Sequence, residues 1–290
     1  MEHRPFRSVL YIPASRARAM DKARTLPADA VIFDLEDAVA PTEKVAARTT
    51  LAETLAEGGF GARALLVRIN GFESGWAEDD LAAVAPTRPE AVLLPKVNGA
   101  ADVEALARLL DSRPETAETR IWAMMETPRG ALNAGEIAAA PRMAGFVLGT
   151  NDLAKDLGAR FRADRLPLMG ALQLCLMAAR AEGLVAVDGV YNAFKDLDGL
   201  RAECEQGRDL GFDGKTLIHP DQLAVANAVF APAEAETDLA RRQIAAFEEA
   251  QARGEGIAVV DGRIVENLHI VTARRTLALA AAIDAMREAS

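Results

Sequence analysis

Eight short apolar segments recur along the chain, and amphipathic stretches with helical periodicity separate them. The segments are SVLYIPA (8–14), AVIFDLEDA (30–38), ALLVRIN (64–70), AVLLPKV (91–97), IWAMMET (121–127), AGFVLGT (144–150), VAVDGVY (185–191) and KTLIHP (215–220). Unbroken apolar runs are typical of strands that are covered on both faces, as in a parallel sheet. Strands that alternate with helices predict βα units. Eight such units predict an α/β protein with a (β/α)₈ barrel.

A doubly wound open sheet is the alternative architecture. Such sheets more often have about five to seven strands and a glycine-rich first turn, whereas the first turn here, PASRARAM, has no GxGxxG pattern. The length of 290 residues suits one barrel of ~250 residues with an added segment. The barrel is therefore the favoured fold, and we expect it to occupy residues 1–230.

The pattern changes in residues 231–290, for which we expect a C-terminal extension of helix, hairpin and helix. PAEAETDLARRQIAAFEEAQARG is a strongly charged helical stretch, and GIAVVDGRIVEN has two apolar runs around Asp261-Gly262, which is a hairpin signal. An Ala-rich helix is expected over 268–288. A closed barrel does not need this extension, so it either covers one end of its own barrel or packs on a neighbouring subunit.

The composition excludes several classes of partner. A formal net charge of -10 argues against nucleic acid or an anionic membrane as the main partner, although a local basic patch is enough for a small anionic ligand. Two cysteines, Cys175 and Cys204, are too few for a disulfide framework and are expected to be free and buried. The N-terminus has no signal-peptide pattern and no apolar run reaches ~20 residues, so we expect a soluble cytoplasmic protein.

Two of the apolar runs stop abruptly at a carboxylate. IWAMMETPRG reaches Glu126, and MAGFVLGTNDLA reaches Asp152. The active site of a (β/α)₈ barrel lies at the carboxyl ends of its strands, so this pair can hold one divalent metal ion there. Only oxygen ligands are on offer, without a Cys/His cluster, which suits Mg²⁺ or Mn²⁺ completed by substrate and water rather than zinc.

Three carboxylates, Asp34, Glu36 and Asp37, crowd the second apolar run. Carboxylates in a buried strand repel and desolvate one another, so a nearby cation is expected. Arg68 is the natural counter-charge, and it can clamp a substrate carboxylate or a developing oxyanion, or form an ion pair with Glu36 or Asp37. Lys96 is a candidate for a Schiff base, but the carboxylates around it favour its charged form.

The stretch ASRARAMDKARTL, which follows the first expected strand, is a basic helix in an acidic protein. It concentrates Arg16, Arg18, Lys22 and Arg24, which predicts a phosphate site or, alternatively, a solvated helix face. His219 has no ligand pattern around it, and both a structural and a catalytic role stay open for it.

Several of these segments together closely resemble the HpcH/HpaI aldolase/citrate lyase family, in its citrate lyase beta-like and malyl-CoA lyase branch. The matching stretches are RSVLYIPASRARAMDKA, ADAVIFDLEDAVAPTEKVAAR, LVRIN, VLLPKV, METPRG, GTNDLAKDLG, GFDGKTLIHPDQL and GIAVVDGRIVENLHIVTARR. The resemblance implies a (β/α)₈ barrel, Mg²⁺ dependence, an acyl-CoA substrate with a small α-keto or hydroxy acid, and a homotrimer or a dimer of trimers.

The resemblance also implies roles for individual residues. Glu126 and Asp152 look like the metal ligands, and Arg68 with Glu126 looks like the contact to the keto or hydroxy acid. Glu36 and Asp37 look like residues that orient metal-bound water. The positions similar to coenzyme A contacts are Tyr11, Arg16, Lys22, Ile218, His219 and Pro220.

The chain departs from the family pattern at two positions. Where malyl-CoA lyases have an Asp, the proposed general base from a neighbouring subunit, this chain has Glu266, whose carboxylate reaches about one methylene further. Asn98 stands where relatives often have Glu. Glu266 is the candidate for the proton shuttle, and its longer side chain puts the substrate range in question.

The leading functional expectation is Mg²⁺-dependent cleavage or formation of the C–C bond of a β-hydroxyacyl-CoA of the malyl-CoA or citramalyl-CoA type. The first alternative is a (3S)-malyl-CoA thioesterase on the same scaffold. The second is a citrate lyase beta subunit that acts on a carrier-bound acyl chain. A non-catalytic scaffold is the remaining alternative.

Overall fold

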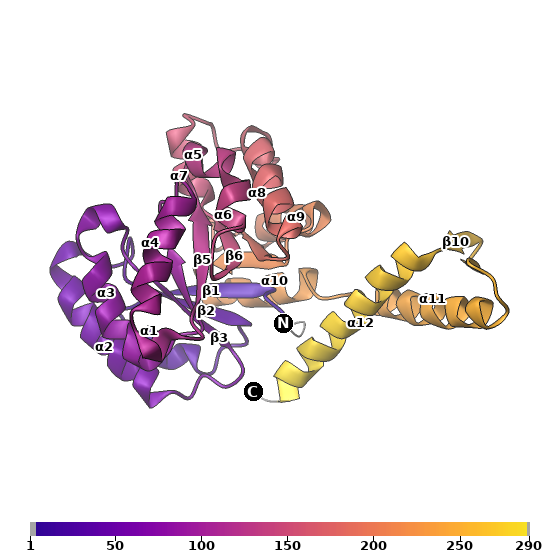
Figure 1. Ribbon diagram of the computed structural model, residues 1–290, viewed down its shortest axis with the longest axis horizontal. Helices are drawn as coiled ribbons and strands as arrows, with labels where there is room; N and C mark the ends of the chain where they lie inside the picture. Colours follow the sequence, from indigo (N-terminus) through magenta and orange to yellow (C-terminus); the bar gives the residue numbers. More distant parts are fainter. Residues whose placement is uncertain (1–3, 289–290) are drawn as a thin grey trace. The chain divides into compact units, whose positions relative to one another are not determined.

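The computed structural model describes residues 4–288, which form two compact units. One unit is Phe6–Ala228, and the other contains residues 229–288 together with Arg4 and Pro5. In the first unit, eight parallel strands close into a barrel in sequence order (Figure 1). Its closure pairs Val9 of the first strand with Thr216 of the last. The predicted (β/α)₈ fold is therefore confirmed.

The strands and helices of the barrel unit alternate along the chain. The strands are β1 (Ser8–Pro13), β2 (Ala30–Asp34), β3 (Ala64–Arg68), β4 (Ala91–Leu94), β5 (Arg120–Met125), β6 (Met143–Leu148), β7 (Val185–Asp188) and β8 (Gly214–Leu217). The helices are α1 (Ala17–Ala23), α2 (Lys44–Glu57), α3 (Ala77–Val84), α4 (Ala100–Asp111), α5 (Pro128–Leu132), α6 (Ala134–Ala138), α7 (Thr150–Asp156), α8 (Met169–Ala181), α9 (Leu197–Leu210) and α10 (Leu223–Val229).

The eight strands begin within one residue of the expected positions, but they end earlier than the apolar runs do. The chain beyond several of them stays buried, as at Leu35 after β2, Ile69 after β3 and Val97 after β4. The chain therefore remains buried beyond the last residue that pairs with a neighbouring strand. As a result, Glu36, Lys96 and Glu126 lie on loops just past the strands.

Side chains fill the inside of the barrel at the amino ends of the strands. Trp122 of β5 lies there beside Phe6, with 5.2 Å between the ring centroids. Gly145 of β6 makes room for it, since a Cβ at this position would lie 2.5 Å from the indole ring. A packed barrel of this kind has no pore, so ligands reach it only at the opposite mouth.

A buried ion network fixes the loop between α7 and α8 to the outside of the barrel. Lys215 and Asp188 are fully buried and 3.1 Å apart, and Lys215 also lies 2.7 Å from Glu203 of α9. Arg165 of the loop donates two 2.7 Å hydrogen bonds to Asp188. Burial disfavours these charges, so mutual pairing is what makes the arrangement tolerable.

The second unit contains α11 (Glu234–Ala252), β9 (Ala258–Val260), β10 (Arg263–Val265) and α12 (Asn267–Glu288). The two strands are antiparallel, and the residues between them, Asp261 and Gly262, have φ angles of 50° and 74°. Positive φ at both positions is the requirement of a type I′ hairpin turn, which confirms the hairpin expected there. Phe247, Val265 and Ile270 belong to the apolar core of this second unit. In residues 4–288 we find no helix with the length and hydropathy of a membrane span.

Candidate active site

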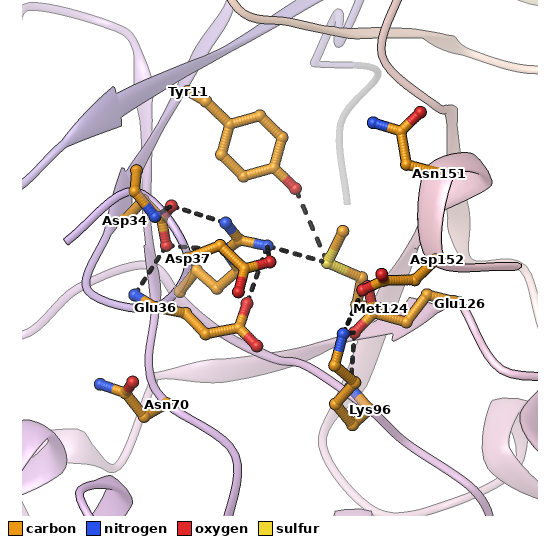
Figure 2. A network of polar contacts seen from close by, with 12 residues as sticks. Tyr11, Asp34, Glu36, Asp37, Asn70, Lys96, Met124, Glu126, Asn151 and Asp152 are labelled. Carbon is orange, nitrogen blue, oxygen red and sulfur yellow. Dashed lines mark hydrogen bonds and ion pairs between the residues drawn. The ribbon is translucent and has the colours of Figure 1, made fainter. Parts of the chain in front are cut away.

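The barrel mouth gathers charged side chains from five successive strand ends, β2 to β6. They line or border a cavity of about 400 Å³. Its lining includes Tyr11, Asp34, Asp37, Arg68, Met124, Glu126, Gly149, Asn151, Asp152, Asn192, Thr216 and Ile218. Figure 2 shows the network that holds these groups together, with acidic side chains on both sides of the central Met124.

Arg68 is the basic centre of the cavity, and Asp34 holds it. Arg68 Nε and Nη2 donate to the two oxygens of Asp34 at 2.7 and 2.5 Å, and both residues are buried. The guanidinium also lies 5.0 Å from the centre of the Tyr11 ring. Burial alone lowers the pKa of Arg68, but the charge of Asp34 outweighs it and the pKa is raised. Arg68 is thus a fixed, permanently charged group.

The crowding of the three carboxylates is resolved by Arg68 and by a turn of the chain. Asp34 accepts hydrogen bonds from the backbone N–H groups of Glu36 and Ala38, at 2.8 and 3.0 Å. This turn buries Glu36 and leaves the side chain of Asp37 68% exposed. The cation expected near these carboxylates is therefore Arg68 itself, and its main partner is Asp34 rather than Glu36 or Asp37.

Glu36 keeps one unsatisfied oxygen. Its Oε2 lies 2.8 Å from Arg68 Nη1 as an ion pair, but without hydrogen-bond geometry, so this buried atom has no hydrogen-bond partner in the described part of the chain. Burial raises the pKa of Glu36 to about 8, against the opposing effect of Arg68. A buried acceptor that accepts no hydrogen bond is costly, so this oxygen, although ion-paired with Arg68, is a candidate contact for a ligand.

Lys44 fixes the loop that carries Glu36. Its buried ammonium donates to the carbonyls of Leu35 and Glu36 at 2.9 and 3.0 Å, and to Asn70 Oδ1 at 2.6 Å. All three of its hydrogens are thus used. The loops after β2 and β3 are joined by this one side chain, which the sequence analysis did not single out.

Glu126 and Asp152 converge from neighbouring strand ends, as expected for the pair. Glu126 is buried and accepts a 2.8 Å hydrogen bond from the backbone N–H of Lys96. Asp152 lies in the first turn of α7, and the Lys96 ammonium contacts its Oδ2. Burial raises the pKa of Glu126, whereas the Lys96 contact outweighs burial at Asp152 and lowers the pKa there.

The pair fits a hard divalent cation. Both groups are oxygen donors, and they already share one positive charge, the ammonium of Lys96. Within residues 4–288 there is no cluster of three or more acidic, His or Cys side chains that could hold a metal. Two carboxylates with the remaining positions left to substrate and water are the usual provision for Mg²⁺. The Schiff-base role considered for Lys96 is disfavoured, because its pKa is raised: burial lowers it, but Asp152 and the other carboxylates outweigh that effect.

The positions similar to coenzyme A contacts fall into two groups. Tyr11 of β1 lines the cavity, as does Ile218, which directly follows the neighbouring strand β8. Arg16 and Lys22 are exposed at either end of α1, outside the residues that line the cavity. His219 stacks on Phe194, with 4.7 Å between the ring centroids, and its Nδ1 accepts from the N–H of Asp221, as a residue with a structural role does. Pro220 follows at the start of a short 3₁₀ turn.

Glu266 belongs to the C-terminal unit. It lies between β10 and α12, its side chain is exposed, and its backbone N–H donates to His269 Nδ1 at 3.0 Å. This contact anchors the start of α12 and leaves the carboxylate free to meet another surface.

Comparison with known proteins identifies the family. The HpcH/HpaI aldolase/citrate lyase family model matches residues 7–220. (3S)-Malyl-CoA thioesterase from Cereibacter sphaeroides is 63% identical over 283 residues, which cover 98% of this chain and 97% of that protein. Citrate lyase subunit beta from Leuconostoc mesenteroides subsp. cremoris is 36% identical over 280 residues, 94% of this chain and 93% of that protein.

A solved structure agrees with these relatives. The protein CitE from Mycobacterium tuberculosis, in complex with magnesium, acetoacetate and coenzyme A, superposes with a TM-score of 0.78 at 33% identity, covering 96% of this chain and 98% of that one. The chain is thus an enzyme of the citrate lyase beta-like kind. It belongs to the HpcH/HpaI aldolase/citrate lyase family, as its motifs indicated.

Proposed function

We propose that this enzyme is a Mg²⁺-dependent acyl-CoA thioesterase that hydrolyses (3S)-malyl-CoA to malate and free coenzyme A. The observation that carries the proposal is the 63% identity, over almost the whole chain, to proteins of that activity. This favours the hydrolytic alternative over the leading expectation of C–C cleavage, since the citrate lyase subunits are far less similar, at 36%.

The geometry of the mouth supports hydrolysis. In the reaction, a bond forms between a water oxygen and the thioester carbon, the C–S bond breaks, one proton leaves the water and one reaches the thiolate. Arg68, held by Asp34, is placed to bind the substrate carboxylate or the oxyanion that develops. Oε2 of Glu36, which is ion-paired with Arg68 but accepts no hydrogen bond, is available to accept one from the substrate hydroxyl. Glu126 and Asp152 would hold Mg²⁺, which polarises the oxygens bound to it.

A product assay separates hydrolysis from C–C cleavage. With (3S)-malyl-CoA and Mg²⁺, we expect free thiol and malate in equal amounts, measured by thiol titration and chromatography, and loss of both with EDTA. Glyoxylate and acetyl-CoA without free thiol would instead establish the lyase. C–C cleavage is the second candidate because the similar CitE protein was solved with magnesium and the keto acid acetoacetate, and a lyase must bind a keto acid as its product.

The C-terminal unit supports a further part of the proposal, that it packs on a neighbouring subunit of a homotrimer or larger assembly. Val259, Ile264, Leu268 and Val271 are between 58% and 65% exposed. Exposed apolar groups gathered on a hairpin and the adjoining helix turn are typical of an interface. Glu266 lies among them in the sequence, so packing of this face against a second barrel would carry the carboxylate to that barrel's mouth.

We expect the Glu266→Ala variant to lower kcat by about 10²–10⁴, because general acid–base catalysis typically contributes that much. Mn²⁺ and coenzyme A affinity, measured by calorimetry, should stay close to wild type. Glu255→Ala is the matched control, since Glu255 is also an exposed carboxylate of the extension and its ion pair is with the neighbouring exposed Arg253. Unchanged turnover in Glu266→Ala would remove this residue from the mechanism.

A further inference from the structure

The ammonium of Lys96 occupies the place between the two expected metal ligands. It contacts Asp152 Oδ2 and lies 3.5 Å from Glu126 Oε1. Figure 2 shows the Lys96 side chain reaching to both carboxylates from its own loop. A divalent cation bound to the same two oxygens would lie against this ammonium, and two cations at contact distance repel strongly in a part-buried site. Metal and ammonium therefore exclude each other.

A second cavity offers the Lys96 ammonium an alternative position. It lines a second, open cavity of about 800 Å³, whose lining includes neither Glu126 nor Asp152. That cavity contains the exposed carboxylates of Glu73 and Asp156. The Lys96 side chain is 32% exposed, and the four-carbon stem of a lysine is flexible. The ammonium can therefore swing from the first cavity into the second by rotation of the side chain, without movement of the backbone.

The backbone N–H of Lys96 can hold Glu126 in either position of the Lys96 side chain. Its φ angle of 55° is in the left-handed region, which is uncommon for a residue with a Cβ. This conformation directs the N–H to Glu126 Oε1 at 2.8 Å. The backbone thus holds one ligand in place, independently of where the ammonium lies.

We propose that Lys96 is a tethered cation that competes with the divalent metal for Glu126 and Asp152, and that metal binding moves its ammonium to Glu73 and Asp156. In this role Lys96 lowers the metal affinity and keeps the two carboxylates compensated until the metal arrives. The proposal concerns the metal site alone, and it holds for hydrolysis and for C–C cleavage alike.

Metal titration of the Lys96→Met variant tests the competition. Methionine keeps most of the apolar stem and removes the charge. We therefore expect the Kd for Mn²⁺, measured by electron paramagnetic resonance, to fall about fivefold, the upper end of what a part-exposed ion pair contributes. Thermal unfolding in EDTA should show a lower Tm than wild type, because the carboxylates have lost their counter-ion. Equal or weaker Mn²⁺ binding would overturn the proposal, as would the absence of Mn²⁺ binding by the wild type.

Lys155→Met is the matched control. Lys155 Nζ lies 3.9 Å from Asp152 Oδ1, but it is 76% exposed and does not lie between the two carboxylates. Its removal is expected to change the Kd by no more than about twofold, since exposed pairs contribute little. An equal gain in both variants would show general charge repulsion rather than competition and would contradict the proposal.

A double-mutant cycle tests the second cavity. Glu73→Gln with Asp156→Asn should weaken Mn²⁺ binding, because the displaced ammonium loses its acceptors. In the Lys96→Met background the same pair of changes should have a clearly smaller effect, so the two sets are not additive. Additive effects would mean that the ammonium does not move there.

Wild-type protein gives an independent readout, which does not depend on the stability of any variant. Reductive methylation followed by peptide mass spectrometry reports how accessible each amine is. Saturating Mg²⁺ should increase the labelling of Lys96 several-fold, while that of Lys195, an exposed lysine outside both cavities, stays constant as an internal reference. Labelling of Lys96 that is unchanged or reduced by Mg²⁺ would refute the displacement.

Discussion

The Asp34→Asn variant is expected to fold with reduced stability and to lose about 10²–10³ in kcat, the usual cost of removing or misplacing one donor to a developing oxyanion. Asp34 binds Arg68 through both oxygens and at the same time accepts two backbone hydrogen bonds from its own turn. Asparagine has the same shape, but its amide NH₂ would face an N–H donor of Arg68 where Asp34 presents an acceptor. Arg68 would then keep Glu36 as its nearest ionic partner, with Asp37 at 3.9 Å, and rotate toward them.

Stability loss and turnover loss can be separated, because the barrel contains a second pair of the same kind. Arg7 donates to both oxygens of Asp29 at 2.7 and 2.8 Å, and both residues are buried at the amino ends of the strands. Breaking either buried pair costs roughly 3 kcal/mol. Asp29→Asn should therefore lower the free energy of unfolding about as much as Asp34→Asn does, with kcat of the folded enzyme unchanged.

Kinetics and metal binding together decide the role of Asp34. If it positions Arg68, kcat falls while the Kd for Mn²⁺ stays close to wild type, since Glu126 and Asp152 are untouched. Wild-type kcat in folded Asp34→Asn, or an equal loss of kcat in Asp29→Asn, would show that Asp34 is only structural.

The role of Asp34 illustrates what a single sequence can and cannot predict. The apolar runs are long enough to locate all eight strand starts, and their abrupt ends at Glu126 and Asp152 located the carboxylate pair. The partner of Arg68 depends instead on the register between strands, in which Asp34 stands directly opposite Arg68. Register in a closed barrel follows from the stagger of the strands around the whole ring. No local pattern in either segment carries that information.

The position of the Lys96 ammonium and the role of Gly149 could not be predicted from the sequence for a different reason. The sequence indicated that Lys96 is charged. It did not indicate that the ammonium lies between Glu126 and Asp152, because this depends on how the segments after β4, β5 and β6 meet. The sequence does not show why position 149 of the LGTND motif is glycine. The reason is steric: Glu126, 23 positions earlier in the chain, leaves no room for a Cβ there. Side-chain chemistry can be read from a sequence, whereas the space left for it depends on the packed structure.

The Gly149→Ala variant is expected to fold and to bind Mn²⁺ at least about 10²-fold more weakly, since a misplacement of about 1 Å at a site can cost that much. A Cβ on Gly149 would lie 2.4 Å from Glu126 Cβ and 2.8 Å from its Oε2. The φ angle of Gly149 is -92°, which any residue can adopt, so the backbone itself tolerates alanine. The conflict is with the root of the Glu126 side chain, which cannot rotate away as the tip of a long side chain can.

Gly135→Ala is the control that isolates this contact. Gly135 lies in α6, and a Cβ there would meet nothing within 4 Å. Alanine in an open helical position is stabilising by roughly 0.5–1 kcal/mol, so this variant should unfold at a slightly higher temperature and bind Mn²⁺ as the wild type does. If Gly149→Ala instead kept wild-type Mn²⁺ affinity, Glu126 would not be a ligand held by that contact, and the metal would have to bind without it. Because the change adds one methyl group and no charge, its effect on Mn²⁺ binding reports only the position of the Glu126 carboxylate.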